Sequence, residues 1–396
     1  MRSANAPPFR LMLAGTAATF LGIGMQRFAY ALLLPAMITA GWLAPSVGGM
    51  IGAVNLGGYL FGALFGPRLE ARFGFRRLLL AEMGLVALSF AASSLPLPWA
   101  WLALWRMLAG FAGGTVMVVA GPAVQALIPP AWRGLAAGFT FLGVGSGVVF
   151  GALFLPLVMR EAGIAASWWF LAAGGAAVLG LSFWLWRGGT PPPRSPMPLF
   201  GGIRGAHDWR LVLAYAAAAV AATPHMVWWP DFIARGLGAG SGTAGTMWLI
   251  YGASAALGPL LLGRMVDRWG LGPTLLFALA LQVAADILPL FSVGKAGLVL
   301  SSLAAGATAT GLSGLFLLLT RRESGGASAT LWSVATAAYG AAQTASGFFL
   351  AWLYATTGQH LPLFALGLAG AMLAALLTER PKEARASSAS APERGG

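Results

Sequence analysis

The chain consists of long apolar stretches separated by short polar connections or by connections that contain glycine and proline. A helix needs about 20 mostly apolar residues to cross a bilayer, and these stretches have that length. The pattern therefore predicts an all-α membrane protein with twelve transmembrane helices. We place them at residues 11–37, 45–66, 77–95, 98–127, 133–158, 164–186, 210–234, 243–263, 273–292, 296–319, 328–356 and 361–378.

Composition excludes the main alternatives to a membrane protein. Hydrophobic residues make up 58% of the 396 residues and charged residues only 9%, whereas a soluble chain carries about 25% charged residues. So few charges could not cover the surface of a soluble protein. We therefore exclude a soluble enzyme, a nucleic-acid-binding domain and a disordered protein. Because cysteine is absent, disulfides and thiolate metal sites are excluded too.

One polar, proline-rich connection divides the apolar stretches into two sets of six. Proline lacks the amide donor that a helix interior needs, and four prolines lie between residues 190 and 197. We predict an N-terminal six-helix half at 1–187, a cytoplasmic linker at 188–209 and a C-terminal six-helix half at 210–378. The polar remainder, 379–396, is expected to be a disordered cytoplasmic tail.

Lysine and arginine are distributed unevenly between the connections. Of the 24 such residues, 19 lie in the connections that share a side with the termini, and three lie in the others. Cytoplasmic loops carry the excess of positive charge in membrane proteins. We therefore expect a multi-pass protein of the bacterial inner membrane with both termini in the cytoplasm. The same distribution explains the net charge of +13 without any nucleic acid.

Two connections repeat one pattern. Arg72 and Gly74 follow the second stretch, and Arg268 and Gly270 follow the eighth, 196 residues later. This spacing is close to half the chain, so a duplicated six-helix unit explains it. Asp267 precedes Arg268 in the second copy.

The second copy matches, residue for residue, the G-x-x-x-D-R-x-G loop of the major facilitator superfamily, which the chain resembles over nearly its whole length. The first copy departs from the pattern, because Ala71 stands at the aspartate position and Glu70 is displaced by one. The resemblance implies two pseudo-symmetric halves and a gating role for these loops. The alternative is that the arginines only anchor the loops at the membrane surface. The gating residues so implied are Glu70, Arg72, Gly74, Gly263, Asp267, Arg268 and Gly270.

Further segments are similar to parts of the same superfamily. Arg106, Gly110 and Gly113 resemble the R-x-x-x-G-x-x-G stretch of its fourth helix, and residues 22–30 and 224–238 resemble its YbfB/YjiJ-type branch. Gly143 and Gly147 lie four residues apart in the fifth stretch, a spacing that favours close packing of two helices.

Ionisable residues inside a span are costly and are therefore candidates for function. Arg27 and Arg106 lie at a similar depth, and the resemblance implies that their helices line a central cavity. Guanidinium groups suit a carboxylate or phosphate, so we expect both to contact an anionic substrate. The alternative is permanent pairing with Asp231 or with helix-end carbonyls. The substrate-binding candidates are Arg27, Tyr30, Arg106, His225, Trp229 and Asp231.

Asp231, Asp286 and His225 are also the candidates for proton coupling. Each has a structural alternative. Asp231 can pair with Arg235 four residues later, Asp286 can make a structural hydrogen bond, and His225 can be a core histidine.

The motifs of catalytic sites, of nucleotide-binding loops and of zinc sites are missing from the sequence. We therefore expect no enzyme activity, no cofactor and no metal. The sequence and the resemblance together predict a monomeric secondary active transporter that moves a small organic solute, preferably an anion, by alternating access with proton coupling. The alternatives are an exporter of hydrophobic or cationic compounds and a non-transporting membrane receptor.

Overall fold

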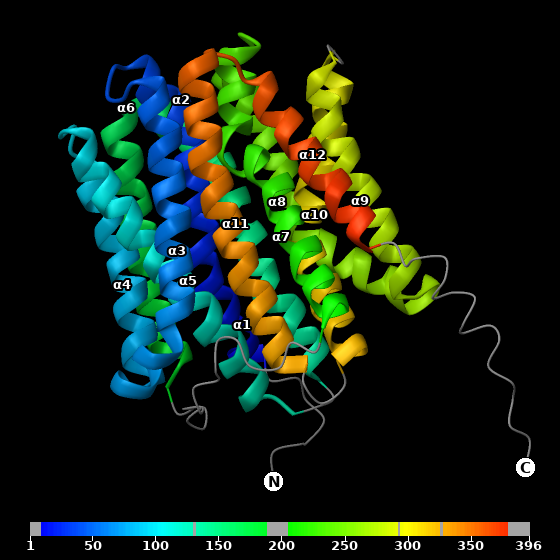
Figure 1. The fold of residues 1–396 in the computed structure, drawn as a ribbon. Coiled ribbons are helices and arrows are strands. Elements are labelled where there is room, and N and C mark those ends of the chain that lie inside the picture. Colours follow the sequence, from blue (N-terminus) through cyan, green and yellow to red (C-terminus); the bar gives the residue numbers. More distant parts are fainter. Residues whose placement is uncertain (1–8, 130–131, 188–204, 292–293, 325–327, 379–396) are drawn as a thin grey trace, which may run out of the picture.

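The computed structural model describes residues 9–129, 132–187, 205–291, 294–324 and 328–378. Nearly all of these residues are helical, and they contain no strand, which confirms the all-α fold. The helices run side by side along one common direction (Figure 1). The predicted tail and most of the predicted linker lie outside the described residues.

The N-terminal group of helices runs from Phe9 to Leu185. A first helix is continuous through α1, η1 and α2, and η1 is a stretch of wider π-helix. The elements are α1 (Phe9–Thr19), η1 (Phe20–Met25), α2 (Gln26–Thr39), α3 (Pro45–Phe73), α4 (Phe75–Ser93), α5 (Trp99–Leu127) and α6 (Arg133–Leu185). The 53 residues of α6 are interrupted at Gly163, where φ is 84° and ψ is −175°. A straight helix of that length would be about 80 Å long, far more than a bilayer needs, so we describe α6 as two arms.

The C-terminal group runs from Ala206 to Thr378. Its first helix starts at Ala206, earlier than the predicted residue 210, and ends in a π-helical turn. The elements are α7 (Ala206–Asp231), η3 (Phe232–Gly236), α8 (Gly240–Trp269), α9 (Leu271–Ile287), η4 (Leu288–Leu290), α10 (Gly294–Ser324), α11 (Ser328–Thr357) and α12 (Leu361–Thr378).

Nine helices among the described residues are long and apolar enough to cross a membrane, and the two arms of α6 enter that number as one. Large apolar side chains such as Phe61, Leu153 and Trp352 are more than half exposed. In lipid such side chains need no cover. The chain is therefore a multi-pass membrane protein, while the number of twelve spans stays a prediction.

The repeated connections have the same backbone conformation. Gly74 has φ 80° and ψ 146°, and Gly270 has φ 84° and ψ 165°. Each glycine ends one helix, donates its N–H to the carbonyl four residues earlier at 2.9 Å, and begins the next helix. A positive φ strongly favours glycine. The sequence repeat is thus also a repeat of structure.

A second repeat links the ends of each group. The side chain of Arg10, at the start of α1, donates from Nε to the Leu185 carbonyl at the end of α6 at 3.0 Å. Arg210, near the start of α7, donates from Nε to the Leu377 carbonyl at the end of α12 at 2.7 Å. A cation suits these carbonyls, because the last turn of a helix leaves them unpaired and carries partial negative charge.

Glycines allow α3 and α5 to approach until their backbones touch. A Cβ added to Gly62 would lie 1.9 Å from the Phe111 carbonyl oxygen, and one added to Gly114 would lie 2.1 Å from the Tyr59 carbonyl oxygen. The predicted close packing of Gly143 and Gly147 is confirmed as well. A Cβ on Gly147 would lie 2.6 Å from the Cα atom of Gly24 in η1.

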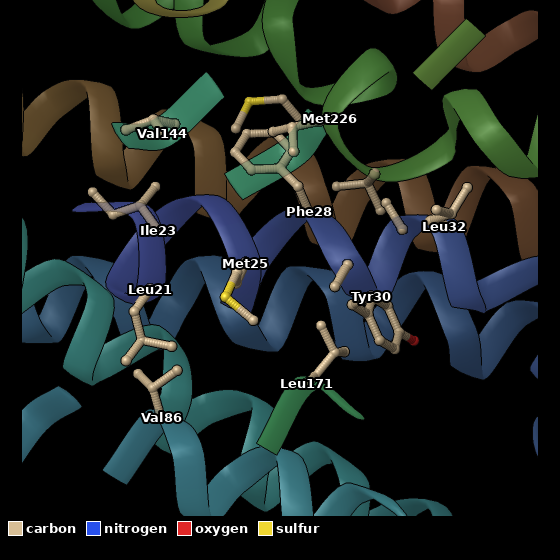
Figure 2. Close-up of a cluster of buried hydrophobic side chains, with 14 of the residues drawn as sticks. Leu21, Ile23, Met25, Phe28, Tyr30, Leu32, Val86, Val144, Leu171 and Met226 are labelled. Atoms are coloured by element: carbon tan, nitrogen blue, oxygen red, sulfur yellow. The ribbon is translucent and has the colours of Figure 1, made fainter. Parts of the chain in front are cut away.

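The two groups meet mainly where α2 packs on α7, α3 on α11 and α6 on α8, with smaller contacts of α2 with α8 and of α3 with α7. In Figure 1, α11 (orange) lies beside α3 (blue). The helix of η1 and α2 is central, and its side chains reach both groups. Figure 2 shows Leu21 directed toward Val86 of α4, and Phe28 beside Met226 of α7.

Candidate functional site

A small cavity lies where α2 and α3 of the N-terminal group meet α7 of the C-terminal group. Its volume is about 10 Å³, which is close to the minimum that a single water molecule occupies. Because both groups contribute to its wall, any change in their relative position changes its size. The lining residues are Arg27, Tyr30, Ala31, Gly52, Asn55, Leu56, Met226 and Val227.

Arg27 is the charged residue of this wall, and its guanidinium is poorly satisfied. Nη1 lies 3.5 Å from Oε1 of Gln343 in α11, at the outer limit of a hydrogen bond. The Nε and Nη2 atoms are buried, and no described residue accepts a hydrogen bond from them. The centre of the guanidinium lies 4.2 Å from the ring centroid of Tyr59 in α3, a favourable cation–π distance. Arg27 is thus partly buried between the groups, and two of its buried donors are unpaired among the described residues.

Tyr30 lies one helical turn after Arg27 on the same wall. Its hydroxyl donates to the Gly48 carbonyl at 2.7 Å. Asn55, opposite on α3, donates from Nδ2 both to Oε1 of Gln26 at 2.9 Å and to the Arg106 carbonyl at 2.7 Å. The pocket therefore has a polar wall whose groups are fixed by hydrogen bonds.

Arg106, the second predicted arginine, lies inside the N-terminal group. Its Nη1 donates to the Gln26 carbonyl at 2.8 Å and its Nη2 to the hydroxyl of Ser89 at 3.0 Å. The guanidinium also lies 5.2 Å from the ring centroid of Trp168. It is fully buried and does not line the Arg27 cavity. The structure therefore places the two arginines in different surroundings.

Asp231 is bound on both carboxylate oxygens. Arg235 donates from Nε to Oδ1 at 2.5 Å and from Nη2 to Oδ2 at 2.6 Å, which is the same-helix pair considered as an alternative. His360, at the start of α12, lies 2.8 Å from Oδ2 through Nε2. Tyr354 of α11 accepts a further hydrogen bond from Arg235 at 3.3 Å. This network fastens the end of α7 to α11 and α12.

A cavity of about 730 Å³ adjoins this network. Phe232, Arg235, Tyr354 and His360 line one side of it, and Pro289, Leu290 and Leu298 line another. The described residues contain no group of three or more His, Cys, Asp or Glu side chains that could hold a metal ion.

His225 and Asp286 lie together in a separate place, inside the C-terminal group. Nδ1 of His225 is 3.2 Å from Oδ1 of Asp286, and both side chains are at most 1% exposed. Trp229, one turn after His225, donates from Nε1 to the hydroxyl of Ser302 at 3.0 Å. Its ring centroid lies 4.7 Å from that of His225. Neither His225 nor Trp229 lines the Arg27 cavity.

The predicted gating residues lie at the ends of α3 and α8. Glu70 and Arg72 belong to the last turn of α3, and Asp267 and Arg268 to the last turn of α8. The Glu70 carbonyl accepts the N–H of Gly74. Gly263 has open space where a Cβ would be. The geometry thus gives both copies the same place in the fold, and their role in gating stays a prediction.

Sequence reasoning did not select several residues that complete these networks. Gln343 and Tyr59 contact Arg27, and His360 binds Asp231. Gln343 is an amide within an otherwise apolar stretch, a signal that could have singled it out. The contacts themselves join α2 to α3 and α11, and no local pattern reports such a distant partner.

Comparison with known proteins agrees with this architecture. A family model described as "Uncharacterised MFS-type transporter YbfB" matches residues 19–379, which is most of the chain. The chain belongs to the YbfB-type family of the major facilitator superfamily. Superfamily members are carriers without enzyme activity, so the chain is a membrane transporter and not an enzyme. No curated protein sequence matches it.

Solved structures show how far the superfamily fold extends over this chain. A D-xylose–proton symporter has a TM-score of 0.73 at 17% identity, with 93% of this chain and 97% of that chain covered. A bacterial homologue of the human lysosomal transporter Spinster, inward-facing and unoccupied, has a TM-score of 0.62 at 18% identity, with 94% and 95% covered. At such identities the likeness shows the superfamily fold alone.

Proposed function

We propose that this transporter is a monomeric secondary carrier of small organic anions, coupled to protons, that alternates access to a site between its two helix groups. The sites and charges described above support a bacterial inner-membrane carrier with both termini in the cytoplasm. The solute binds at the Arg27 cavity, with Tyr30 beside it. The remaining candidates then act outside the cavity as proton-coupling or positioning residues. They are His225, Asp286, Trp229, Asp231 and Arg106.

Arg27 is the observation that carries this proposal. Two of its donor nitrogens are buried and lack a partner among the described residues, and its guanidinium contacts an amide and a tyrosine ring. An unsatisfied buried donor costs about 1–3 kcal/mol. A carboxylate or phosphate placed there would accept both donors and balance the charge. One planar anion would therefore satisfy both unpaired donors of Arg27.

The cavity is closed at about 10 Å³, and a solute enters only if the groups move apart. Contacts across the interface involve small residues and single rings. A Cβ on Gly49 of α3 would lie 2.0 Å from Trp228 of α7, and Trp248 of α8 donates to the Phe28 carbonyl at 3.2 Å. Such contacts can separate as rigid surfaces, which alternating access requires.

The export of cationic compounds finds less support. Its best anionic anchor was Asp231, whose two oxygens already bind Arg235 and His360. A cation would have to displace both partners. Trp228 and Trp229 are fully buried within these networks, so they offer no free aromatic surface for cation–π binding.

Flux measurements on purified protein in proteoliposomes test the proposal. Small mono- and dicarboxylates and phosphorylated compounds are supplied as labelled solutes, with amines, neutral sugars and hydrophobic cations as comparison classes. We expect saturable uptake of at least one anion and stimulation by an inward proton gradient. Uptake confined to cations or neutral compounds would refute the anion assignment. No flux in any class, together with ligand-induced thermal stabilisation, would favour the receptor instead.

A further inference from the structure

A closed polar network surrounds His225 and Asp286 in the interior of the C-terminal group. Nε2 of His225 is 2.9 Å from the hydroxyl of Ser301 on α10, and that hydroxyl donates to the Ala285 carbonyl at 2.8 Å. On the other side, Gln282 of α9 donates from Nε2 to Oδ2 of Asp286 at 2.9 Å. Thr308 of α10 in turn donates to Oε1 of Gln282. Three helices therefore contribute to one network.

This network is walled off from water and from other charges. The ring of Phe364 on α12 packs edge-on against His225 at 5.2 Å, and a Cβ on Gly367 would lie 2.8 Å from Oδ1 of Asp286. Both α12 and the rest of α9 lack charged residues. On α7, Asp231 is bound by Arg235 and His360. The other charged or histidine residues of α7 and α10 lie at the helix ends and are His207, Asp208, Arg210, Lys295, Arg321, Arg322 and Glu323. Tyr215 of α7 bonds to the hydroxyl of Ser313.

Charge balance then fixes how many protons the pair can hold. A carboxylate beside a neutral imidazole has a net charge of −1, and among the described residues no lysine or arginine contacts the pair to offset that charge. Burying an unpaired charge costs several kcal/mol. With one additional proton the pair is neutral, whether that proton resides on Asp286 or on His225. In such a coupled pair the proton belongs to both groups together.

We propose that His225 and Asp286 form the proton-binding site of this carrier, which holds one exchangeable proton while closed and releases it when the C-terminal group admits water. The site is separate from the Arg27 cavity. The two sites are joined through α7, because His225 belongs to the proton site and its neighbour Met226 lines the Arg27 cavity. The role of the proton site in coupling rests on the proposed function, but proton binding itself does not.

The local structure of α7 provides a route for opening. Pro224, directly before His225, lacks the amide hydrogen that would bond the carbonyl four residues earlier. Pro230 lies in the same helix, which ends in the π-helical η3. Sharp bends in helices occur at prolines and at π-helical turns. A bend at Pro224 moves His225 relative to Asp286 and opens the network to water.

Infrared difference spectroscopy of the reconstituted full-length carrier tests proton binding without any solute, with the proton as the probe. Spectra between acidic and alkaline buffer are compared for wild type, Asp286→Asn, His225→Gln and Asp208→Asn. Asp208 is also buried, near the start of α7, and serves as the matched control. We expect a carboxyl or imidazolium band that is lost in the first two variants and kept in the third. Identical spectra in all four proteins would refute the site.

Transport of the anion found in the flux screen supplies the second readout. We expect Asp286→Asn to keep solute exchange at equal pH but to lose accumulation under a proton gradient, so that internal and external concentrations become equal. Gradient-driven accumulation at the wild-type level in both Asp286→Asn and His225→Gln would overturn the assignment. If the wild type transports nothing, the proposed function fails, while the spectra still decide whether the pair binds a proton.

Discussion

We expect the stability of the protein to change in opposite directions when Arg27 or Arg106 is replaced by methionine. Arg27→Met and Arg106→Met each remove a guanidinium and leave an unbranched apolar side chain that adapts to its surroundings. The starting points differ, however. Among the described residues, Arg106 makes two short hydrogen bonds, to Gln26 and Ser89, and leaves only Nε unpaired. Arg27 leaves both Nε and Nη2 unpaired and makes one hydrogen bond, at 3.5 Å.

The magnitudes follow from these contacts. In Arg27→Met, loss of two unsatisfied donors removes a cost of about 1–3 kcal/mol each, and loss of the Tyr59 contact removes about 2 kcal/mol of stabilisation. The expected net effect is a gain of about 2 kcal/mol without substrate. Arg106→Met loses two charged hydrogen bonds worth about 1.5–3 kcal/mol each and removes one unsatisfied donor, Nε, which costs about 1–3 kcal/mol. It should therefore destabilise the protein by about 2–3 kcal/mol.

Thermal unfolding of purified protein in detergent, without solute, measures both effects, and flux in proteoliposomes measures function. We expect Arg27→Met to unfold at a higher temperature than wild type and to transport no anion. Arg106→Met should unfold at a lower temperature, and its remaining flux should follow the amount of folded protein. Equal destabilisation by the two substitutions, or normal flux in Arg27→Met, would refute the division of the arginines into a binding and a structural residue.

Three further predictions concern the fold and the repeated loops. Asp267→Asn should slow transport several-fold with solute affinity nearly unchanged, whereas Ala71→Asp in the other copy should do much less; equal loss of binding in both would contradict a gating role. Gly62→Ala should lower the unfolding temperature, because overpacking costs about 1–3 kcal/mol, while Gly314→Ala, with open space at Cβ, should not. A reporter fused after Arg187 should lie in the cytoplasm, and a periplasmic signal there would overturn the predicted orientation.

The sequence allowed the fold to be predicted because its signals are local. Apolar length predicted the helices, and the matched Gly74 and Gly270 predicted a repeat that the backbone confirms. The break in α6 at Gly163 falls in the predicted connection between residues 158 and 164, which Arg160 and Glu161 mark. The π-helical turn η1 was not predicted, because it lies within uniformly apolar sequence. A helix that widens by one residue per turn leaves no trace in hydropathy.

The candidate site could be predicted only in part, because its chemistry depends on partners from other helices. Depth along a helix placed Arg27 and Arg106 at one level, yet depth does not say which way a side chain points. One faces the interface and the other faces α4. The pair of Asp231 and Arg235 was among the alternatives because its spacing is local. His360, 129 residues from Asp231, lies beyond the reach of any such rule.

The arginines at the two group ends have a mechanical consequence. Arg10 joins the first helix of its group to the last, and Arg210 does the same in the other group. Each group therefore has a hydrogen bond between its first and last helices. Such a link opposes sliding of these helices and favours movement of the group as one rigid body. If the two groups turn as units, the contacts between them have to break in each cycle, and the hydrogen bond from Trp248 to the Phe28 carbonyl is one of them.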